Sequence, residues 1–360
     1  KKSKERKFDF DVIGIGAGFA GLALIHYLRE LGVSVRIFDK ASDIGGTWTW
    51  NRYPGAATDS ESYYYCLTFS KELLQKWSWS KRYPDWQETL SYFHFIADEC
   101  DMWRDIQLNT EIVEAEYLAD IGGWKVETAD GKTYSIKYLV STMGMISEPL
   151  IPNIKGMDRF KGPLFHSARW PKEGLDYAGK RVGIIGTGAT AVQCVPHLGE
   201  GAKELFVFQR TPSSVDVRND RPTDPAWVQG LQPGWQRERM HNFTTVISGG
   251  RFEVDLVNDG WTDLINNIAL AAHRHAQAGG EVVDPDALVQ RADDLKMQKV
   301  RARVDAIVRD RATAEALKPW YNQFCKRPCF HDQYLPTFNR PNVHLVDTQG
   351  QGVERITERG

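Results

Sequence analysis

The feature that most constrains the fold of this chain is a glycine-rich turn between a short apolar run and a helical pattern. This turn occurs twice in the sequence. The first turn begins at the end of the run 8–15, precedes the helical pattern 22–32, and carries Gly14, Gly16, Ala17, Gly18, Ala20 and Gly21. The second turn follows the run 181–185 and carries Gly186, Thr187, Gly188, Ala189, Thr190 and Ala191. Strand, tight glycine turn and helix in this order predict a βαβ unit whose helix N-terminus binds a pyrophosphate. We therefore expect an α/β fold with two Rossmann-like dinucleotide-binding domains.

The residues that end the second strand of each unit differ in charge. In the first unit the strand 33–38 ends at Asp39, where a carboxylate is placed to accept hydrogen bonds from a ribose hydroxyl. In the second unit the strand 205–209 ends in Arg210 and Thr211, without an acid. A carboxylate there would repel a 2′-phosphate, whereas a guanidinium binds one through two hydrogen bonds. The second site is therefore expected to prefer NADPH over NADH.

The first unit is followed by a loop that holds a glycine pair and two tryptophans, Gly45-Gly46-Thr47-Trp48-Thr49-Trp50. Such a loop suits the wall of a large planar ring, although tryptophans at these positions also serve to cover a protein core. With both glycine turns present, we interpret the first site as an FAD site and the second as an NADPH site.

Length, charge and cysteine usage narrow the class of protein. At 360 residues the chain exceeds the roughly 250–300 at which single cores split into domains. A net charge of -2 gives no reason to expect a nucleic acid or an acidic membrane as partner. No apolar run is long enough for a membrane helix, and no signal peptide precedes the first strand. The five scattered cysteines indicate reduced thiols in a cytoplasmic protein, and Cys325 with Cys329 are not expected to form a metal site.

Residues 160–171, FKGPLFHSARWP, stand between the two glycine turns and place five residue types at fixed intervals. The stretch resembles the fingerprint of Baeyer–Villiger monooxygenases at Phe160, Gly162, His166, Trp170 and Pro171. Related N-hydroxylating and flavin-containing monooxygenases carry a different ending where Trp170 and Pro171 stand. The resemblance implies a linker that couples the two nucleotide domains, with His166 and Trp170 in structural and dynamic roles rather than in proton transfer.

The same resemblance assigns residues around the flavin. The segment NRYPGAATD, residues 51–59, is similar to a family motif that places Asp59 beside the flavin. Many relatives carry Arg-Cys where this chain has Ala57-Thr58, which removes a possible cofactor contact. By resemblance the FAD site is also lined by Gly46, Thr47, Trp48, Thr49, Trp50, Tyr65 and Ile112.

An adjacent lysine–arginine pair in CKRPCFHDQYLP, residues 325–336, is similar to another family segment. The resemblance implies that Lys326 binds the 2′-phosphate or ribose of NADPH and that Arg327 reaches the flavin. The ketone oxygenation that the resemblance implies needs a permanent cation to stabilise an anionic C4a-peroxyflavin. Arginine suits this role because it stays protonated at any working pH. We therefore expect Arg327 to be catalytic, with Asp59 as the partner that orients it.

The predicted domain limits follow these motifs. Residues 1–150 form the N-terminal part of an FAD-binding domain, 151–178 the linker, and 179–345 an NADPH-binding domain with a helical insertion at about 216–320. Residues 346–360 are expected to begin the return to the FAD domain. Because the chain lacks an initiating Met and stops where a new strand is due, we expect a C-terminally truncated chain.

The resulting prediction is an NADPH- and O2-dependent flavin monooxygenase that converts ketones to esters or lactones. The segment 320–335 and Ala57-Thr58 resemble members that act on large cyclic or steroid-like ketones. Two alternatives remain: a related enzyme that oxygenates amines or sulfides, and a noncatalytic nucleotide-binding fragment. The sequence leaves the oligomeric state open.

Overall fold

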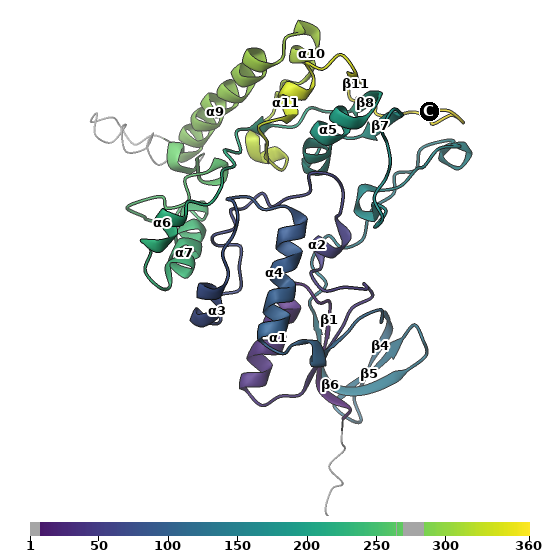
Figure 1. The fold of residues 1–360 in the computed structure, drawn as a ribbon, viewed down its shortest axis with the longest axis vertical. Helices are drawn as coiled ribbons and strands as arrows, with labels where there is room; N and C mark the ends of the chain where they lie inside the picture. Colours follow the sequence, from purple (N-terminus) through teal and green to yellow (C-terminus); the bar gives the residue numbers. More distant parts are fainter. Residues whose placement is uncertain (1–7, 264, 269–283) are drawn as a thin grey trace, which may run out of the picture.

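The computed structural model describes residues 8–263, 265–268 and 284–360. Figure 1 shows the N-terminal half, in purple and blue, below the C-terminal half, in green and yellow. Each half contains one glycine turn, and the linker with the fingerprint joins the two halves. No helix among the described residues is long and apolar enough to cross a membrane.

The N-terminal half is built on a mixed six-stranded sheet with the order β3-β2-β1-β6-β5-β4. Its parallel part joins β1 to β2 and β6, and its antiparallel part is the meander β4-β5-β6. The strands are β1 Phe10–Ile15, β2 Val35–Phe38, β3 Ile106–Gln107, β4 Ile112–Leu118, β5 Gly123–Thr128 and β6 Thr133–Ser141. The helices of this half are α1 Phe19–Glu30, α2 Thr47–Trp50, α3 Lys71–Lys76 and α4 Trp86–Glu99.

The C-terminal half contains a three-stranded parallel sheet with the order β11-β8-β7, and a short parallel pair of β9 with β10. The strands are β7 Arg181–Ile185, β8 Glu204–Gln209, β9 Val215–Asp216, β10 Cys329–Phe330 and β11 Val343–Asp347. The helices are α5 Ala189–Gly201, α6 Pro225–Gln229, α7 Trp235–Ile247, α9 Pro285–Ile307, α10 Arg311–Ala316 and α11 Tyr334–Thr337. Both glycine turns join a parallel strand to a helix, which confirms the predicted α/β class.

The helices α6, α7, α9 and α10 of the described residues fall inside the insertion predicted at about 216–320. Figure 1 shows α6 and α7 beside α3 of the N-terminal half. Trp227 and Trp235 from these two helices pack against the core formed by α1, β2 and α4. The insertion therefore bridges both halves of the chain, and part of it covers the aromatic surface that follows the first glycine turn.

The segment that ends the described chain runs beside the linker. Ile356 N–H donates to the carbonyl of Lys155 at 2.8 Å, and Lys161 N–H donates to the carbonyl of Glu358 at 3.1 Å. Both contacts are made with the linker, and the return of residues 346–360 to the FAD domain stays a prediction. The exact limits at residues 150, 178 and 345 stay predictions.

Candidate functional site

The first glycine turn leaves the start of α1 free for a ligand. Gly16 has a φ of +112°, and a side chain there would collide with the carbonyl oxygen of Thr142 at 2.8 Å. Gly21 lies so close to the turn that an added Cβ would come within 2.2 Å of the carbonyl oxygen of Gly16. Gly18 is the N-cap of α1 and provides no side-chain hydrogen bond. The first turn of the helix thus keeps unpaired N–H groups of the kind that bind phosphate oxygens.

Asp39 braces this turn from the end of β2. Its two carboxylate oxygens accept hydrogen bonds from the N–H groups of Ala17, at 2.7 Å, and Ala41, at 2.8 Å. Each carboxylate oxygen has a second lone pair, so these contacts leave capacity for a ribose hydroxyl. The ribose contact stays a prediction, and the structure adds a second role for Asp39 in holding the turn.

The second glycine turn opens in front of α5. Gly186 has a φ of +105°, and a Cβ added there or at Gly188 would meet nothing within 4 Å. Gly188 caps α5 without a side-chain hydrogen bond, while Thr187 Oγ1 donates to the carbonyl of Thr211 at 2.8 Å. The open space before an uncapped helix start fits the pyrophosphate of a second dinucleotide.

Two cations predicted to bind the 2′-phosphate lie near each other beside this turn. Desolvation and the positive charge of Arg210 together lower the pKa of Lys326. The Lys326 ammonium lies 5.1 Å from the centre of the Tyr321 ring. Both side chains are exposed, and neither forms an ion pair with a carboxylate in the part of the chain that the structure describes. Two neighbouring cations without a counter-ion form a fitting site for a phosphate group.

If Arg210 binds the 2′-phosphate, Arg210→Ala should weaken NADPH binding about tenfold to a hundredfold and leave NADH binding nearly unchanged. The reason is the loss of charge-assisted hydrogen bonds, each worth roughly 1.5–3 kcal/mol. Titration with both dinucleotides measures the effect. Arg181→Ala is the matched control, because Arg181 is an exposed arginine of the same sheet that pairs with Glu204. An equal loss for NADPH and NADH would contradict the assignment.

The residues predicted to line the flavin divide into buried and accessible ones. Trp48 and Thr49 belong to the protein interior, and Trp48 Nε1 donates to the Tyr65 hydroxyl at 3.2 Å. Of the two interpretations of the loop tryptophans, a ligand wall or core residues, the burial of Trp48 favours the second for this residue. Thr47 is exposed, whereas Trp50, Tyr65 and Ile112 are half-buried. Their contacts with a flavin stay predictions.

The structure brings together Asp59 and Arg327, which are far apart in the sequence. Arg327 Nη2 lies 2.9 Å from Asp59 Oδ2, and its guanidinium stacks over the Trp261 ring at 5.3 Å. Trp261 Nε1 also donates to the backbone carbonyl of Asp59 at 3.0 Å. The Asp59 side chain is largely buried, whereas that of Arg327 is 60% exposed. The carboxylate thus holds a guanidinium whose other donors have no hydrogen-bond partner among the described residues and could bind a ligand.

Gln193, which sequence reasoning missed, ties this pair to the second domain. Gln193 lies in α5 and is buried. It accepts a hydrogen bond from the Tyr53 hydroxyl at 3.0 Å and donates to the Ala57 carbonyl at 2.9 Å and to Asp59 Oδ1 at 3.3 Å. The helix that starts at the second glycine turn therefore also orients the Asp59 carboxylate. No local sequence signal separates such a glutamine from a surface one.

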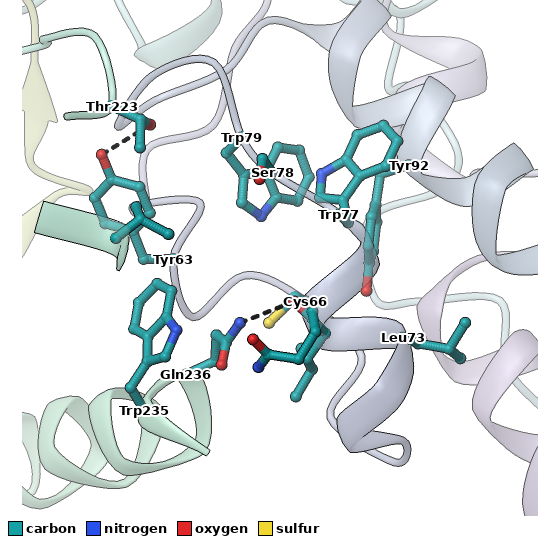
Figure 2. A pocket seen from close by; sticks show the side chains of 13 residues that line it. Tyr63, Cys66, Leu73, Trp77, Ser78, Trp79, Tyr92, Thr223, Trp235 and Gln236 are labelled. Carbon is teal, nitrogen blue, oxygen red and sulfur yellow. Dashed lines mark hydrogen bonds between the residues drawn. The ribbon is translucent and has the colours of Figure 1, made fainter. Parts of the chain in front are cut away.

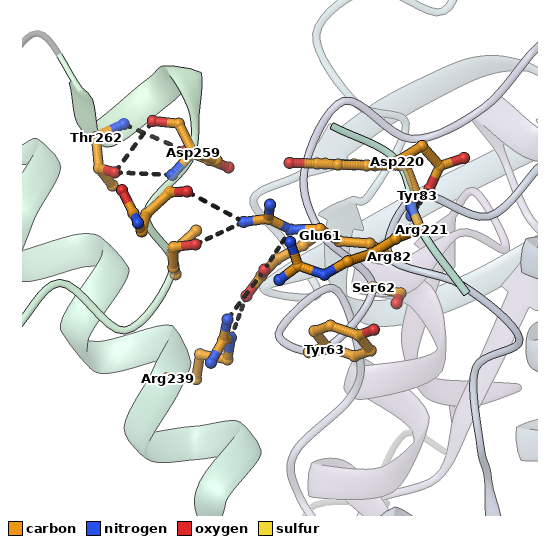
Figure 3. A network of polar contacts seen from close by, with 12 residues as sticks. Glu61, Ser62, Tyr63, Arg82, Tyr83, Asp220, Arg221, Arg239, Asp259 and Thr262 are labelled. Atoms are coloured by element: carbon orange, nitrogen blue, oxygen red, sulfur yellow. Dashed lines mark hydrogen bonds and ion pairs between the residues drawn. The ribbon is translucent and has the colours of Figure 1, made fainter. Parts of the chain in front are cut away.

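A buried charge cluster, also missed from the sequence, fixes the loop just beyond Asp59 (Figure 3). The Glu61 carboxylate is fully buried and pairs with Arg82 at 3.1 Å and with Arg239 of α7. Arg82 Nη2 also donates to the Val257 carbonyl at 2.5 Å. These contacts hold the insertion against the loop that carries Asp59.

Asp259 joins this charge cluster as a second acid, and burial raises its pKa to about 6. The groups that act on its charge include Arg82, which favours ionisation, and Glu61, which opposes it. Burial raises the pKa values of Tyr64 and Tyr83, and the negative charge of Asp259 raises them further. One carboxylate oxygen of Asp259 is buried without a partner among the described residues.

A raised folded-state pKa makes stability depend on pH in a defined direction. The folded protein binds the proton more tightly than the unfolded chain, so this contribution is complete below about pH 4 and is lost as the pH rises through about 6. Asp259→Asn should therefore flatten the unfolding free energy between about pH 4 and 6 and raise it at pH 7. Urea titrations across that range measure it, and an unchanged pH profile would contradict the burial effect.

The fingerprint residues make structural contacts. His166 Nδ1 accepts a hydrogen bond from Ala168 N–H at 3.1 Å and caps a short 3-10 helix, Ser167–Arg169. Trp170 packs edge-on against Phe165 and against the core around α5, while the Arg169 guanidinium lies 4.6 Å from the Trp50 ring centre. The linker therefore touches both halves, and the dynamic roles expected of His166 and Trp170 stay predictions. Two other fingerprint residues, Phe160 and Gly162, pack against each other. A Cβ added at Gly162 would lie 2.8 Å from the Phe160 ring.

Comparisons with known proteins identify close relatives. Residues 10–226 match the family described as flavin-binding monooxygenase-like. The neopentalenolactone D synthase of Streptomyces avermitilis is 47% identical over 97% of this chain and 60% of its own length. The Baeyer–Villiger monooxygenase 4 of Dietzia sp. is 41% identical over 98% of this chain and 59% of its own. This chain thus spans about 60% of the length of the curated relatives that it matches.

Solved structures of the same kind resemble the whole fold. The polycyclic ketone monooxygenase from the fungus Thermothelomyces thermophila superposes with a TM-score of 0.83 at 34% identity, covering 99% of this chain and 61% of that one. An oxidised steroid monooxygenase bound to NADP gives a TM-score of 0.82, also at 34% identity, covering 98% and 68%. These likenesses cover nearly the whole chain.

Proposed function

The chain belongs to the flavin-binding monooxygenase-like family and, within it, to the Baeyer–Villiger monooxygenases, and on this premise we propose that the full-length protein converts ketones to esters or lactones with NADPH and O2. FAD binds at the first glycine turn and NADPH at the second. The observation that carries the proposal is the Asp59–Arg327 pair, held between the loop of the first domain and α5 of the second.

The donor sets fit the two cofactors. The uncapped start of α1 and Asp39 would hold the pyrophosphate and ribose of FAD, and the uncapped start of α5 with Arg210 and Lys326 would hold NADPH. A bound flavin supplies hydride acceptance and oxygen activation, while the protein supplies position and electrostatic field.

Arg327 is the residue that stabilises negative charge during oxygen transfer. Its guanidinium stays protonated at working pH, so the charge is present without a proton transfer. Asp59 fixes one side of the guanidinium, Trp261 covers one face, and Gln193 orients Asp59. Fixed charge at the point where an anion develops is commonly the largest catalytic contribution.

The proposed substrates are large cyclic ketones. The names of two similar structures, a polycyclic ketone monooxygenase and a steroid monooxygenase, support this class. We also propose a cytoplasmic location, which the five free cysteines support. Oxygenation of amines or sulfides is the second candidate activity, because the matching family model, flavin-binding monooxygenase-like, names no substrate.

Product analysis tests the proposal. The purified full-length protein should be yellow and should turn a cyclic ketone into the ester or lactone when supplied with NADPH and O2. Oxidation of an amine or sulfide with no ketone turnover would favour the second candidate. A colourless protein that binds NADPH but no flavin would identify a noncatalytic nucleotide-binding protein.

The linker gives a separate prediction. His166→Ala should slow flavin reduction by NADPH in the flavin-loaded, full-length protein and leave the unfolding temperature within a few degrees of wild type, because His166 only caps a short helix in the linker. Stopped-flow absorbance measures the reduction rate. Leu164→Ala is the control, since Leu164 is exposed in the same segment and outside the fingerprint. An unchanged rate of flavin reduction in His166→Ala would show that the fingerprint only connects the two domains.

A further inference from the structure

A small cavity lies between the first domain and the insertion (Figure 2). Its volume is about 70 Å³, and its walls include Cys66, Trp77, Trp79, Tyr92 and Trp235. We call it the indole cavity. None of the described residues that line it is charged, and its lining includes none of Asp59, Trp261 and Arg327. It is therefore separate from the site described above.

Two hydrogen-bond donors of the cavity have no partner. Figure 2 shows the indole nitrogens of Trp79 and Trp235 turned toward its centre. Neither N–H makes a hydrogen bond to another residue in the described part of the chain, and neither is enclosed by protein atoms. Cys66 adds a weak donor, because burial raises the pKa of its thiol to about 12 and keeps it protonated.

Most acceptors of the aromatic wall are already paired or enclosed. The hydroxyls of Tyr63 and Thr223 bond to each other at 3.0 Å, and the Tyr92 hydroxyl accepts from Leu67 N–H at 2.8 Å. The amide oxygen of Gln236 lacks a partner but is enclosed by protein atoms, as is Trp77 Nε1. Ser78 and Gln75, both exposed, complete the polar lining at the rim, whereas Trp79 and Trp235 supply the unpaired N–H donors within the aromatic wall.

We propose that the indole cavity binds a small neutral molecule with a carbonyl oxygen, that is, a ketone, an ester or a lactone. A carbonyl oxygen has two lone pairs and no hydrogen to donate, which matches two converging N–H groups. The aromatic and aliphatic walls match the apolar body of such a molecule. An anion would find no opposite charge there to offset its desolvation.

The size of the cavity agrees with a small ring. A single water needs roughly 10–15 Å³ of such space, so about 70 Å³ holds several waters or one compact organic molecule. The indole, tyrosine and leucine faces of the wall favour the organic molecule, because they offer water no hydrogen bond. The proposal does not rest on the function proposed above, although ketones and lactones are the compounds that this function would convert and form.

A ligand in this cavity would join two parts of the fold. Trp235 comes from α7 of the insertion, whereas Trp79 and Tyr92 come from the segment between α3 and α4 and from α4 itself. Gln236 already links α7 to the Leu74 carbonyl beside the cavity at 3.2 Å. The expected effect of the ligand is to stabilise α7 against the first domain.

The test uses the flavin-loaded, full-length protein with its tryptophans labelled with ¹⁵N, and cyclopentanone as the probe. The sequence above has 12 tryptophans, and Trp79→Phe and Trp235→Phe assign their indole N–H signals in NMR spectra. Cyclopentanone should shift both signals downfield with one common saturation curve. Trp103 is the internal control, because its Nε1 already donates to Asp98 at 2.6 Å and its signal should stay in place.

Two comparisons separate the carbonyl contact from general binding. Methylenecyclopentane has the same shape without the oxygen and should bind at least tenfold more weakly. Trp235→Phe keeps an aromatic ring but removes one N–H, and it should weaken cyclopentanone binding about tenfold while Trp103→Phe leaves it unchanged. The methylenecyclopentane comparison needs no variant, so it decides the matter even if Trp235→Phe is unstable.

Three outcomes would overturn the proposal. These are no saturable shift at Trp79 and Trp235, equal affinity for methylenecyclopentane, or high-resolution density that shows only waters in a crystal soaked with cyclopentanone. Arg327→Ala should leave the Trp79 and Trp235 shifts intact, because the indole cavity does not include Arg327. A failure of ketone turnover with intact shifts would therefore contradict only the proposed function.

Discussion

Replacing Arg327 with alanine in the flavin-loaded, full-length protein should abolish ester formation while NADPH still reduces the flavin. The side chain is mostly exposed and anchored to Asp59 at 2.9 Å, so its loss should not disturb the fold. Losing one preorganised group that stabilises a developing anion typically costs on the order of 10²–10³ in rate. Oxygen consumed by the variant should leave as hydrogen peroxide.

Two further variants separate charge from geometry. Arg327→Lys keeps the positive charge but loses the planar fork that binds Asp59, so it should retain only part of the ester formation. Arg301→Ala is the matched control, because Arg301 also stacks on a tryptophan, Trp320, at 4.4 Å but lies outside the candidate site. Gas chromatography of the products with a peroxide assay measures both outcomes. Near-normal ester formation in Arg327→Ala would refute the role assigned to this residue.

Glu61→Gln should destabilise the protein more than Asp259→Asn, His166→Ala or Arg327→Ala. The Glu61 carboxylate is fully buried between Arg82 and Arg239, so its neutralisation leaves two guanidinium groups without their counter-charge. Breaking a buried ion pair from one side typically costs about 3–5 kcal/mol. Because Arg239 lies in α7, the loss should first release the insertion from the first domain.

Urea unfolding and limited proteolysis measure this effect. The variant should unfold at lower urea and be cleaved faster within the insertion. Glu99→Gln is the control, since Glu99 forms an exposed pair with Lys76, and such pairs are worth about 0–1 kcal/mol. A loss below about 1 kcal/mol for Glu61→Gln, equal to that of the control, would show that the buried cluster does not hold the insertion.

Features that depend on neighbours in the sequence could be predicted. Both glycine turns, their strands and their helices follow from local patterns, because backbone geometry at Gly16 and Gly186 requires glycine. The proximity of Arg210 and Lys326 was implied by a family motif rather than by any local pattern. The pairing of Asp59 with Arg327 likewise came from the resemblance, and the structure brings both pairs together.

Features that depend on long-range packing could not be predicted. Glu61 meets Arg239 only because α7 folds back onto the first domain, and no local signal marks either residue. Gln193 reads as an ordinary helix residue until α5 packs against the loop that carries Asp59. Trp48 could not be assigned for a different reason. A tryptophan in a loop suits a ligand wall and a core equally well, so only its burial in the structure decides between them.

Oxygen labelling tests the central claim most directly. The flavin-loaded, full-length protein is given NADPH, ¹⁸O2 and a polycyclic ketone, and the product is analysed by mass spectrometry. The account predicts an ester or lactone that carries one ¹⁸O atom as the new ring or chain oxygen, with one NADPH consumed for each product formed. NADPH oxidation that yields only labelled hydrogen peroxide, with the ketone recovered unchanged, would contradict it.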